Sequence, residues 1–321
     1  MAKITTIIPC YNEATVLPLL FDRFTAAADR WQMDWNVICV DDGSSDSTWE
    51  VLCRQNSLDS RWQALALARN FGHQTAVSAG LYHADGDVAV VIDADLQDPP
   101  EELGRFIDKW REGYDVVYAI RKQRKEGPLK RFCYWSFYRL AAPLVSFPIP
   151  LDTGDFCVMD RKVVDVLKSM PERNRFVRGL RAWAGFKQTG LEYERQARAA
   201  GEVKYTFRKL LKLALDGIFS FSLVPLKLAT WLGFVVSLLA SGGILFTMIQ
   251  RLFPRWFAGI GLEPVPGYAT IVIAVLFMGG VQLTCLGILG EYLGRIFDEV
   301  KRRPQWVFRD SVGVRGRVPP P

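Results

Sequence analysis

Residues 88–100 read Val-Ala-Val-Val-Ile-Asp-Ala-Asp-Leu-Gln-Asp-Pro-Pro, an apolar run that passes directly into a group of acids and two prolines. The apolar part, residues 88–92, has the length and the β-branched composition of a buried strand. Asp93 and Asp95 follow where this strand ends. Carboxylate oxygens are the ligands that Mg²⁺ and Mn²⁺ prefer, and such a cation commonly binds one or two carboxylates together with substrate phosphates. The alternative interpretation of these acids is a solvated turn that begins a helix.

Three further strand candidates precede this run, and they alternate with stretches of helical spacing. The strand candidates are residues 4–9, 36–40 and 63–68, and the helical stretches include residues 14–29 and 47–55. This alternation predicts a mostly parallel sheet flanked by helices. Because ligands of such sheets bind outside the carboxyl ends of the strands, the polar residues that follow each strand form the candidate site.

The composition excludes several classes of protein. The chain has 321 residues, of which 50% are hydrophobic and 23% are charged, so it is neither a disordered chain nor a small disulfide-stapled domain. Its six cysteines have no paired spacing, which favours reduced cysteines in a cytosol-facing protein over disulfides or a metal site. The net charge of +6 is mild, but residues 121–131 hold six Lys or Arg and one acid. A local anionic partner is therefore favoured over a nucleic acid.

Two long stretches in the last third of the chain carry no charged residue. They are residues 228–250 and residues 264–290, and within the second, residues 268–290 can form one helix. At about 1.5 Å per residue each helix reaches roughly 34 Å, enough to cross a bilayer core of about 30 Å. We predict two transmembrane helices; buried core helices of a soluble domain are the alternative. Basic residues gather before the first stretch and after the second, which predicts that both termini lie in the cytoplasm.

Two other segments have the composition of interfacial helices. Residues 129–147 mix bases with aromatic residues, and residues 209–221 mix lysines with leucines and phenylalanines. Such segments suit the headgroup layer of a membrane, although an amphipathic helix that covers its own soluble domain has the same pattern. We expect the last residues, 309–321, to be loosely ordered.

Four motifs at the ends of the predicted strands resemble the family 2 glycosyltransferases of the GT-A fold. They are IIPCYNE at residues 7–13, VDDGSSD at residues 40–46, RNFG at residues 69–72 and DAD at residues 93–95. Their order and spacing together make the match specific, whereas a single acidic pair occurs by chance in many proteins.

This resemblance implies an α/β GT-A domain with a Rossmann-like, mostly parallel sheet that binds a nucleotide sugar and Mg²⁺ or Mn²⁺. The residues implied to bind the nucleotide sugar are Pro9, Tyr11, Glu13, Asp41, Arg69 and Asp93. The residues implied to hold the metal and the diphosphate are Asp93, Asp95 and Gln97. Asp95 is also a catalytic candidate, because the cation that it holds would neutralise the leaving diphosphate. For Arg69, a surface charge is the alternative.

Three later motifs narrow the resemblance to the polyisoprenyl-phosphate glycosyltransferases with two transmembrane helices. They are DTGDF at residues 152–156, GEVKY at residues 201–205 and GEYLGR at residues 290–295. The class includes bacterial undecaprenyl-phosphate glucosyltransferases and dolichyl-phosphate mannose synthases, and the match extends over residues 3–308. Val203 departs from the small polar residue expected before the lysine. The resemblance implies that Asp155 lies in the acceptor loop as a base or an orienting carboxylate; a turn-forming aspartate is the alternative.

The chemistry of a lipid phosphate acceptor agrees with this class. A phosphate monoester has a second pKa of about 6, so it is already a nucleophile near neutral pH and needs cations to hold it rather than a base. Arg121, Arg124 and Arg131 are the candidates for that role, and Lys204 is a further one. A solvated basic loop or a nonspecific anchor to anionic lipid is the alternative.

The sequence thus predicts an inverting, metal-dependent transfer of one sugar from a nucleotide diphosphate to a polyisoprenyl phosphate at the cytoplasmic face of the inner membrane. By resemblance the favoured pair is UDP-glucose with undecaprenyl phosphate, for cell-envelope glycosylation, with GDP-mannose or a UDP-aminosugar as alternative donors. A processive polysaccharide synthase would be expected to carry a QxxRW motif and more spans. A non-catalytic membrane scaffold would not need the intact acidic cluster.

The predicted organisation has three parts. Residues 1–208 form the cytosolic GT-A domain, residues 209–294 form an interfacial helix and two transmembrane helices, and residues 295–321 form a cytosolic tail. Glycine pairs within both spans, at residues 242–243 and 279–280, favour packing against other subunits, which predicts a homo-oligomer.

Overall fold

The computed structural model describes residues 2–121, 153–170, 172–173, 175–195, 224–259 and 267–314. The chain divides into two compact units, Met1–Lys212 with Arg302–Pro321, and Leu213–Lys301. The two expected interfacial segments lie outside the described residues, as do Arg124, Arg131 and Lys204.

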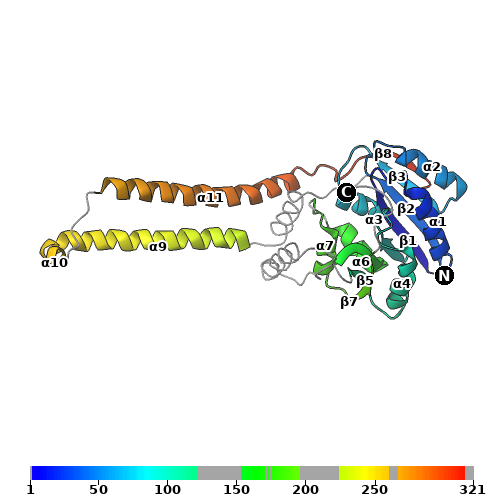
Figure 1. The fold of residues 1–321 in the computed structure, drawn as a ribbon, viewed down its shortest axis with the longest axis horizontal. Helices are drawn as coiled ribbons and strands as arrows, with labels where there is room; N and C mark the ends of the chain where they lie inside the picture. The colour runs from blue at the N-terminus through cyan, green and yellow to red at the C-terminus, as the bar shows by residue number, and fades with distance from the viewer. Residues whose placement is uncertain are drawn as a thin grey trace. The chain divides into compact units, whose positions relative to one another are not determined.

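The described part of the first unit is built on an eight-stranded mixed sheet with the order β7-β5-β6-β4-β1-β2-β3-β8 (Figure 1). The strands are β1 (Lys3–Cys10), β2 (Asp34–Asp41), β3 (Trp62–Leu67), β4 (Val88–Val91), β5 (Val116–Arg121), β6 (Thr153–Asp160), β7 (Gln188–Tyr193) and β8 (Phe308–Val312). Strands β4, β1, β2 and β3 are parallel neighbours, and β5 is parallel to β7. Strand β6 runs antiparallel to β4 and β5, and β8 runs antiparallel to β3. The prediction of a mostly parallel α/β sheet is confirmed.

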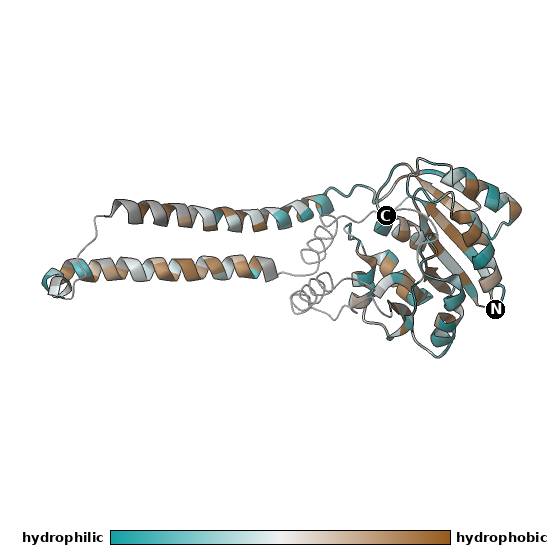
Figure 2. Ribbon diagram, in the orientation of Figure 1, coloured by the Kyte–Doolittle hydropathy of each residue, from teal (hydrophilic) through white to brown (hydrophobic). Residues whose placement is uncertain are grey.

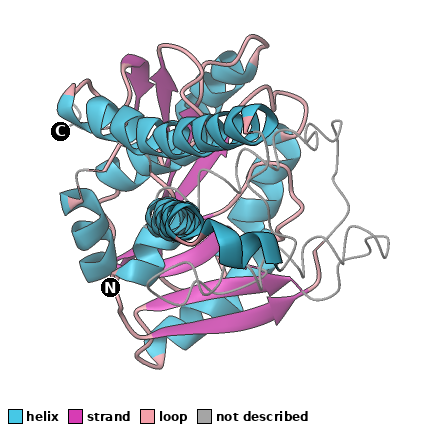
Figure 3. Cartoon of the chain, turned by 90° about the vertical axis from the view of Figure 1, so that its left-hand side faces the viewer, coloured by secondary structure: helices cyan, strands magenta, loops and turns pink. Residues whose placement is uncertain are grey.

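Helices cover both faces of this sheet (Figure 3). They are α1 (Leu17–Ala28), α2 (Thr48–Leu58), α3 (His73–His83), α4 (Leu103–Arg111), which follows the short 3₁₀ helix η1 (Pro100–Glu102), α6 (Arg161–Ser169) and α7 (Val177–Trp183). Two hydrophobic cores lie on the two faces of the sheet, and successive residues of β2 pack alternately into one and the other. The reason is that successive side chains of a strand point to opposite faces. Val37 and Cys39 pack with α1, whereas Ile38 and Val40 pack with α3.

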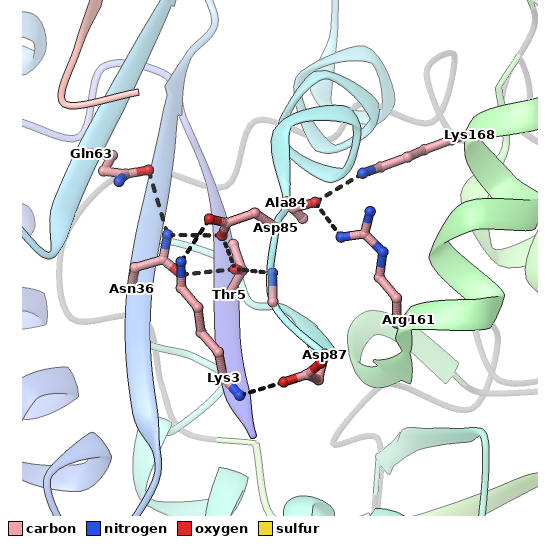
Figure 4. A network of polar contacts seen from close by, with 10 residues as sticks. Lys3, Thr5, Asn36, Gln63, Ala84, Asp85, Asp87, Arg161 and Lys168 are labelled. Atoms are coloured by element: carbon pink, nitrogen blue, oxygen red, sulfur yellow. Dashed lines mark hydrogen bonds and ion pairs between the residues drawn. The ribbon is translucent and has the colours of Figure 1, made fainter. Parts of the chain in front are cut away.

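A buried polar network fixes the amino ends of β1 and β2 and the loop before β4 (Figure 4). The Thr5 hydroxyl donates to Asn36 Oδ1 over 2.7 Å and accepts the Gly86 N–H over 2.9 Å. Lys3 pairs with Asp85 through its ammonium group, 2.7 Å away. Buried hydroxyl and amide groups need such partners, since an unsatisfied one is costly. The network therefore ties together the end of the sheet opposite the predicted motifs.

The second unit is a helical hairpin made of α9 (Val224–Leu252), the short α10 (Pro254–Gly259) and α11 (Tyr268–Val300). Helices α9 and α11 lie side by side, and the Cys285 thiol lies 3.6 Å from the Ala229 carbonyl oxygen. Among the described residues one stretch is long and apolar enough to cross a membrane, Leu226–Gln250, with a mean hydropathy of 2.1. Figure 2 shows the apolar length of α9 and the hydrophilic C-terminal end of α11. The hairpin thus holds one candidate span and a second long helix.

The expectation of a loosely ordered tail is wrong for residues 309–312, which belong to β8 (Phe308–Val312). Just before it, the Trp306 side chain is 1% exposed and packs beside Tyr82 and Phe308. Burial of a tryptophan and pairing with β3 together stabilise this segment. The chain therefore returns to the first unit after the hairpin and adds the last strand of its sheet.

Candidate active site

The first two motifs are joined by hydrogen bonds at the carboxyl ends of β1 and β2. Asn12 has a left-handed φ of 55°, its side-chain Oδ1 accepts the Ser45 N–H over 2.9 Å, and its own N–H donates to Ser44 Oγ over 2.9 Å. The Glu13 N–H donates to Thr48 Oγ1 over 2.9 Å. These bonds fix the loop on which Tyr11 stands, with its ring partly exposed beside the strand ends.

Asp41 is the last residue of β2 and Asp42 follows it, and the two carboxylates accept hydrogen bonds from different segments. Asp41 is 0% exposed, and its Oδ1 accepts the Ser44 N–H over 3.0 Å. Asp42 accepts the Phe71 N–H over 2.7 Å and the Gly72 N–H over 2.9 Å. Burial raises the pKa of Asp42, and those two N–H groups oppose the shift. Asp42 therefore joins the RNFG motif to the VDDGSSD motif, whereas Asp41 bonds within the VDDGSSD motif.

Gly43 allows this close approach. Its φ is +68°, a backbone conformation that L side chains rarely adopt, and a Cβ there would collide with the backbone of Arg69 and Asn70. The Arg69 guanidinium lies 4.2 Å from the centre of the Phe71 ring, a cation–π contact at an exposed site. Pro9 is buried near the carboxyl end of β1.

The acidic motif follows β4 as predicted. The Asp95 side chain is buried, and its Oδ1 accepts the Gln97 N–H over 3.1 Å across a turn in which Leu96 has a φ of 58°. Within the described part of the chain, Asp93 Oδ1 accepts no hydrogen bond, and it lies 3.7 Å from His73 Nε2. Burial raises the pKa of Asp93 to about 6, and the neighbouring Asp98, Asp155 and Asp95 add to the shift while His73 opposes it. The motif thus gathers negative charge that a cation would relieve.

Asp155 lies on β6, and three side chains from helices α3 and α7 contact its carboxylate. Its Oδ2 accepts from Gln74 Nε2 over 2.8 Å and lies 3.1 Å from His73 Nε2, and its Oδ1 accepts from Arg178 Nε over 3.0 Å. Burial alone would raise the pKa of Asp155, but the charges of Arg178 and His73 outweigh it and hold that pKa well below its usual range. Asp155 is therefore a fixed carboxylate, and its side chain is only 8% exposed.

His73 links the two acidic groups of the site. It begins α3 and faces Asp155 and Asp93, and Gln74 beside it also accepts the Val177 N–H over 2.9 Å at the start of α7. Burial lowers the pKa of His73, but the bond to Asp155 and the charge of Asp93 outweigh this and raise it to about 9. His73 thus connects Asp93, which follows β4, with Asp155 of β6.

Asp98 closes the acidic motif from the other side. Its carboxylate accepts the Tyr193 hydroxyl and lies 3.4 Å from Arg195 Nε. Both partners come from the end of β7, so this contact fastens the loop after β4 to the far edge of the sheet. In this structure Asp98 therefore connects the acidic motif to β7 and the residues after it.

The residues present fit a divalent cation that binds together with a diphosphate. Among the described residues, no group of three or more His, Cys, Asp or Glu side chains is arranged to hold a metal ion. Asp93 and Asp95 supply two carboxylates, and one Asp93 oxygen accepts no hydrogen bond. Mg²⁺ usually binds one or two carboxylates and takes its other ligands from phosphates and water. The donor set therefore suits a shared site with substrate and not a closed protein cage.

The structure brings together Asp93, Asp95 and Asp155 in one cluster, and it gathers Pro9, Tyr11, Glu13 and Asp41 at the ends of β1 and β2. Arg121 is the last residue of β5. Sequence reasoning missed three partners of this cluster, His73, Gln74 and Arg178. His73 and Gln74 directly follow the RNFG motif at a strand end, and that position was the available signal. For Arg178, no local pattern points to the site.

A mostly parallel sheet with these motifs and an acidic cluster at its strand ends agrees with the class that the motifs resemble, the glycosyltransferases, because open α/β sheets bind ligands at that edge. Residues 5–167 match glycosyl transferase family 2, and residues 224–296 match the GtrB C-terminal hairpin. The chain belongs to glycosyl transferase family 2 and is an enzyme of that kind.

Three relatives match nearly their whole length. An uncharacterized glycosyltransferase of Synechocystis sp., sll0501, is 44% identical over 97% of this chain and 96% of its own. The uncharacterized glycosyltransferase YkcC of Bacillus subtilis is 43% identical over 97% of this chain and 94% of its own. The SfII prophage-derived bactoprenol glucosyl transferase of Shigella flexneri is 38% identical over 96% of this chain and 98% of its own.

Proposed function

We propose that this enzyme transfers one sugar from a nucleotide diphosphate to a polyisoprenyl phosphate at the cytoplasmic membrane face, with inversion at the sugar carbon. The observation that carries the proposal is the cluster of Asp93, His73 and Asp155 in a chain that also has the hairpin. The favoured pair is UDP-glucose with undecaprenyl phosphate, because a relative that matches nearly end to end is named for glucose transfer to bactoprenol.

On the donor side, the nucleotide would lie over the ends of β1 and β2. Pro9, Tyr11, Glu13 and Asp41, together with Arg69 and Asp93, are the residues proposed to bind the nucleotide sugar. Asp93, Asp95 and Gln97 would hold Mg²⁺ or Mn²⁺, and that cation would supply neutralisation of the leaving diphosphate. Burial and the neighbouring carboxylates raise the pKa of Asp93, and a bound cation would compensate this negative charge, which supports the assignment.

On the acceptor side, an oxygen of the lipid phosphate forms a bond to the sugar C1 while the bond from C1 to the diphosphate breaks. The diphosphate leaves with the electron pair. No proton has to be removed, because the phosphate monoester is already ionised. Asp155 is proposed as the orienting carboxylate and not the base, since three donors already occupy its two oxygens. It would hold His73 and Arg178 in place beside the reacting atoms.

The acceptor phosphate itself is assigned to Arg121, Arg124, Arg131 and Lys204. Cations are suited to a phosphate because they bond its oxygens with charge-assisted hydrogen bonds. The family of relatives named above supports a lipid acceptor, and the six bases in residues 121–131 support this stretch as its binding place.

The membrane part is proposed to be two transmembrane helices, residues 228–250 and 268–290, with the GT-A domain and both termini in the cytoplasm of the inner membrane. A Cβ at Gly242, Gly243, Gly279 or Gly280 would meet no atom within 4 Å among the described residues. Glycines that no neighbouring helix of the same chain contacts are available to another subunit. This supports a homo-oligomer.

The test is to incubate the purified protein with a panel of radiolabelled nucleotide sugars, Mg²⁺ and undecaprenyl phosphate, and to extract the lipid. A single labelled sugar on the lipid is the expected product, and UDP-glucose should be the preferred donor. A growing polymer would indicate a polysaccharide synthase, and no labelled lipid with any donor would indicate a scaffold.

The matched variant for this assay is Asp95→Asn, which removes one anionic ligand and one charge at the diphosphate. We expect transfer and metal-dependent nucleotide binding to be lost, and a chelator should have the same effect on the unaltered enzyme. Activity that survives both treatments would mean that the acidic motif is only a turn.

A further inference from the structure

Arg309 stands on β8, the strand that the chain adds to the sheet after the hairpin. The strand is anchored on both sides of this residue, because Ala68 donates its N–H to the Val307 carbonyl over 2.8 Å and Asp310 pairs with Ala66 of β3. The register of the two strands shifts between Ala66 and Leu67, which pair with Asp310 and Phe308. An irregularity of this kind redirects the side chain at that point.

The redirected side chain reaches the buried carboxylate of β2. Arg309 Nη2 lies 3.5 Å from Asp41 Oδ2, and among the described residues no other ion pair of Asp41 is found. The Oδ1 of Asp41 accepts the Ser44 N–H, but its Oδ2 accepts no hydrogen bond from the residues that the structure describes. A buried carboxylate needs a compensating charge, and here that charge comes from the far end of the chain.

Arg309 itself is not buried. Its side chain is 46% exposed, while that of Asp41 is 0% exposed, and its guanidinium carbon lies 5.9 Å from the centre of the Trp49 ring. The guanidinium has five N–H donors, so one contact with Asp41 leaves others directed away from it. The cation therefore lies between the buried acid and the solvent at the carboxyl end of β2.

We infer that Arg309 is a positioning residue of the donor site, which orients the Asp41 carboxylate for binding of a nucleoside diphosphate. The inference rests on the donor role proposed for Asp41. It assigns a part in nucleotide binding to a strand that lies beyond the hairpin in sequence. If Arg309 only held β8 against the sheet, its substitution would lower stability and leave nucleotide binding unchanged.

The experiment measures UDP binding by calorimetry in the presence of Mg²⁺, and sugar transfer, with the full-length protein. The variants are Arg309→Ala, Arg309→Lys, Asp41→Asn and the double variant with Arg309→Ala and Asp41→Asn. Arg303→Ala is the matched control, since it removes the same charge from an exposed residue shortly before β8. Thermal unfolding of each variant checks that β8 still pairs with β3.

The Arg309 side chain is half-exposed, so loss of its contact with Asp41 should cost about 1 kcal/mol, and we expect Arg309→Ala to weaken UDP binding about fivefold. The KM for the donor should rise by a similar factor, with the KM for the lipid unchanged. Arg309→Lys keeps the charge and should recover most of the affinity. Because Arg309 acts through Asp41, the double variant should bind UDP no more weakly than Asp41→Asn alone.

The inference is overturned if Arg309→Ala binds UDP as the Arg303→Ala control does, or if the losses of the two single variants simply multiply in the double variant. If Asp41→Asn leaves UDP binding unchanged, the donor role of Asp41 is wrong and the inference falls with it. Sugar transfer by the unaltered enzyme in the same preparation reports on the proposed function separately.

Discussion

The substitution Asp155→Asn tests the central cluster of the site most directly. It replaces a carboxylate with an amide of nearly the same shape and removes one negative charge. The carboxylate accepts from Gln74 and Arg178 and contacts His73 at distances of 2.8, 3.0 and 3.1 Å. An amide cannot satisfy all three, because its NH₂ group would face donors on one side.

The size of the effect follows from these contacts. A hydrogen bond to a charged group contributes roughly 1.5 to 3 kcal/mol, and breaking a buried charge pair costs about 3 to 5 kcal/mol in total. We therefore expect the free energy of unfolding to fall by about 3 kcal/mol or more, and turnover to fall at least about a hundredfold, which corresponds to about 2.7 kcal/mol. Nucleotide binding should stay near that of the unaltered enzyme, since Asp41 ends β2 and Asp95 lies in the turn after β4.

The pH dependence of this destabilisation gives a second check. The pKa of Asp155 in the folded enzyme is below its usual range, so its contribution to stability is present above a pH of about 4 and is lost only as the pH falls through the folded value. The difference in unfolding free energy between the two proteins should therefore be largest below a pH of about 6.5. It should shrink as the pH rises toward 9, because the bond to Asp155 is part of what raises the pKa of His73.

The matched control is Asp160→Asn at the other end of β6. Asp160 also accepts two hydrogen bonds, from the Lys162 N–H over 3.1 Å and from Trp110 Nε1 over 2.8 Å, but it lies away from the site. Asn caps a helix about as well as Asp, so this variant should change stability little and spare turnover. The reasoning is refuted if Asp155→Asn keeps full turnover and stability, or if the two variants lose turnover equally.

Two further predictions concern the lipid and the membrane. Replacing Arg124 and Arg131 with Ala should weaken productive use of undecaprenyl phosphate by about two orders of magnitude, because each contact to a phosphate is worth roughly 1.5 to 3 kcal/mol. UDP binding in calorimetry should stay unchanged, and full transfer at low lipid concentration would contradict the prediction. In a cysteine-free background, a cysteine at Gly261 should react with an impermeant thiol reagent outside intact cells and one at Arg303 should not, whereas the reverse pattern would put the domain on the wrong side for a cytosolic donor.

The sheet core could be predicted because its strands are buried on both faces. Strand β4 occupies Val88–Val91 against a predicted 88–92, and all four of its residues are buried. Strands of this kind are continuous apolar runs, so their composition alone distinguishes them from the surrounding helices. The motifs at their ends could be placed for the same reason, since parallel neighbours bring their carboxyl ends to one edge.

The antiparallel and edge strands could not be predicted in this way. Strand β7, Gln188–Tyr193, is mostly half-exposed and carries few apolar residues, and β8, Phe308–Val312, is similar. Each is a strand because of the neighbour with which it pairs, β5 for β7 and β3 for β8. Pairing of this kind is a property of the fold and leaves little signal in a local window.

The partners of the acidic site could not be predicted for the same reason, because they come from segments that are distant in sequence. Gln74 and Asp155 are separated by 81 residues, and Arg309 reaches Asp41 from the opposite end of the chain. The motifs supply acids, and in the fold their cations come from α3, α7 and β8, none of which carries a motif of its own. A cluster of buried carboxylates without those cations would be costly, so distant segments must dock before the acids are held as they are. The order of the acidic site is therefore a consequence of the whole first unit, including the strand that follows the hairpin.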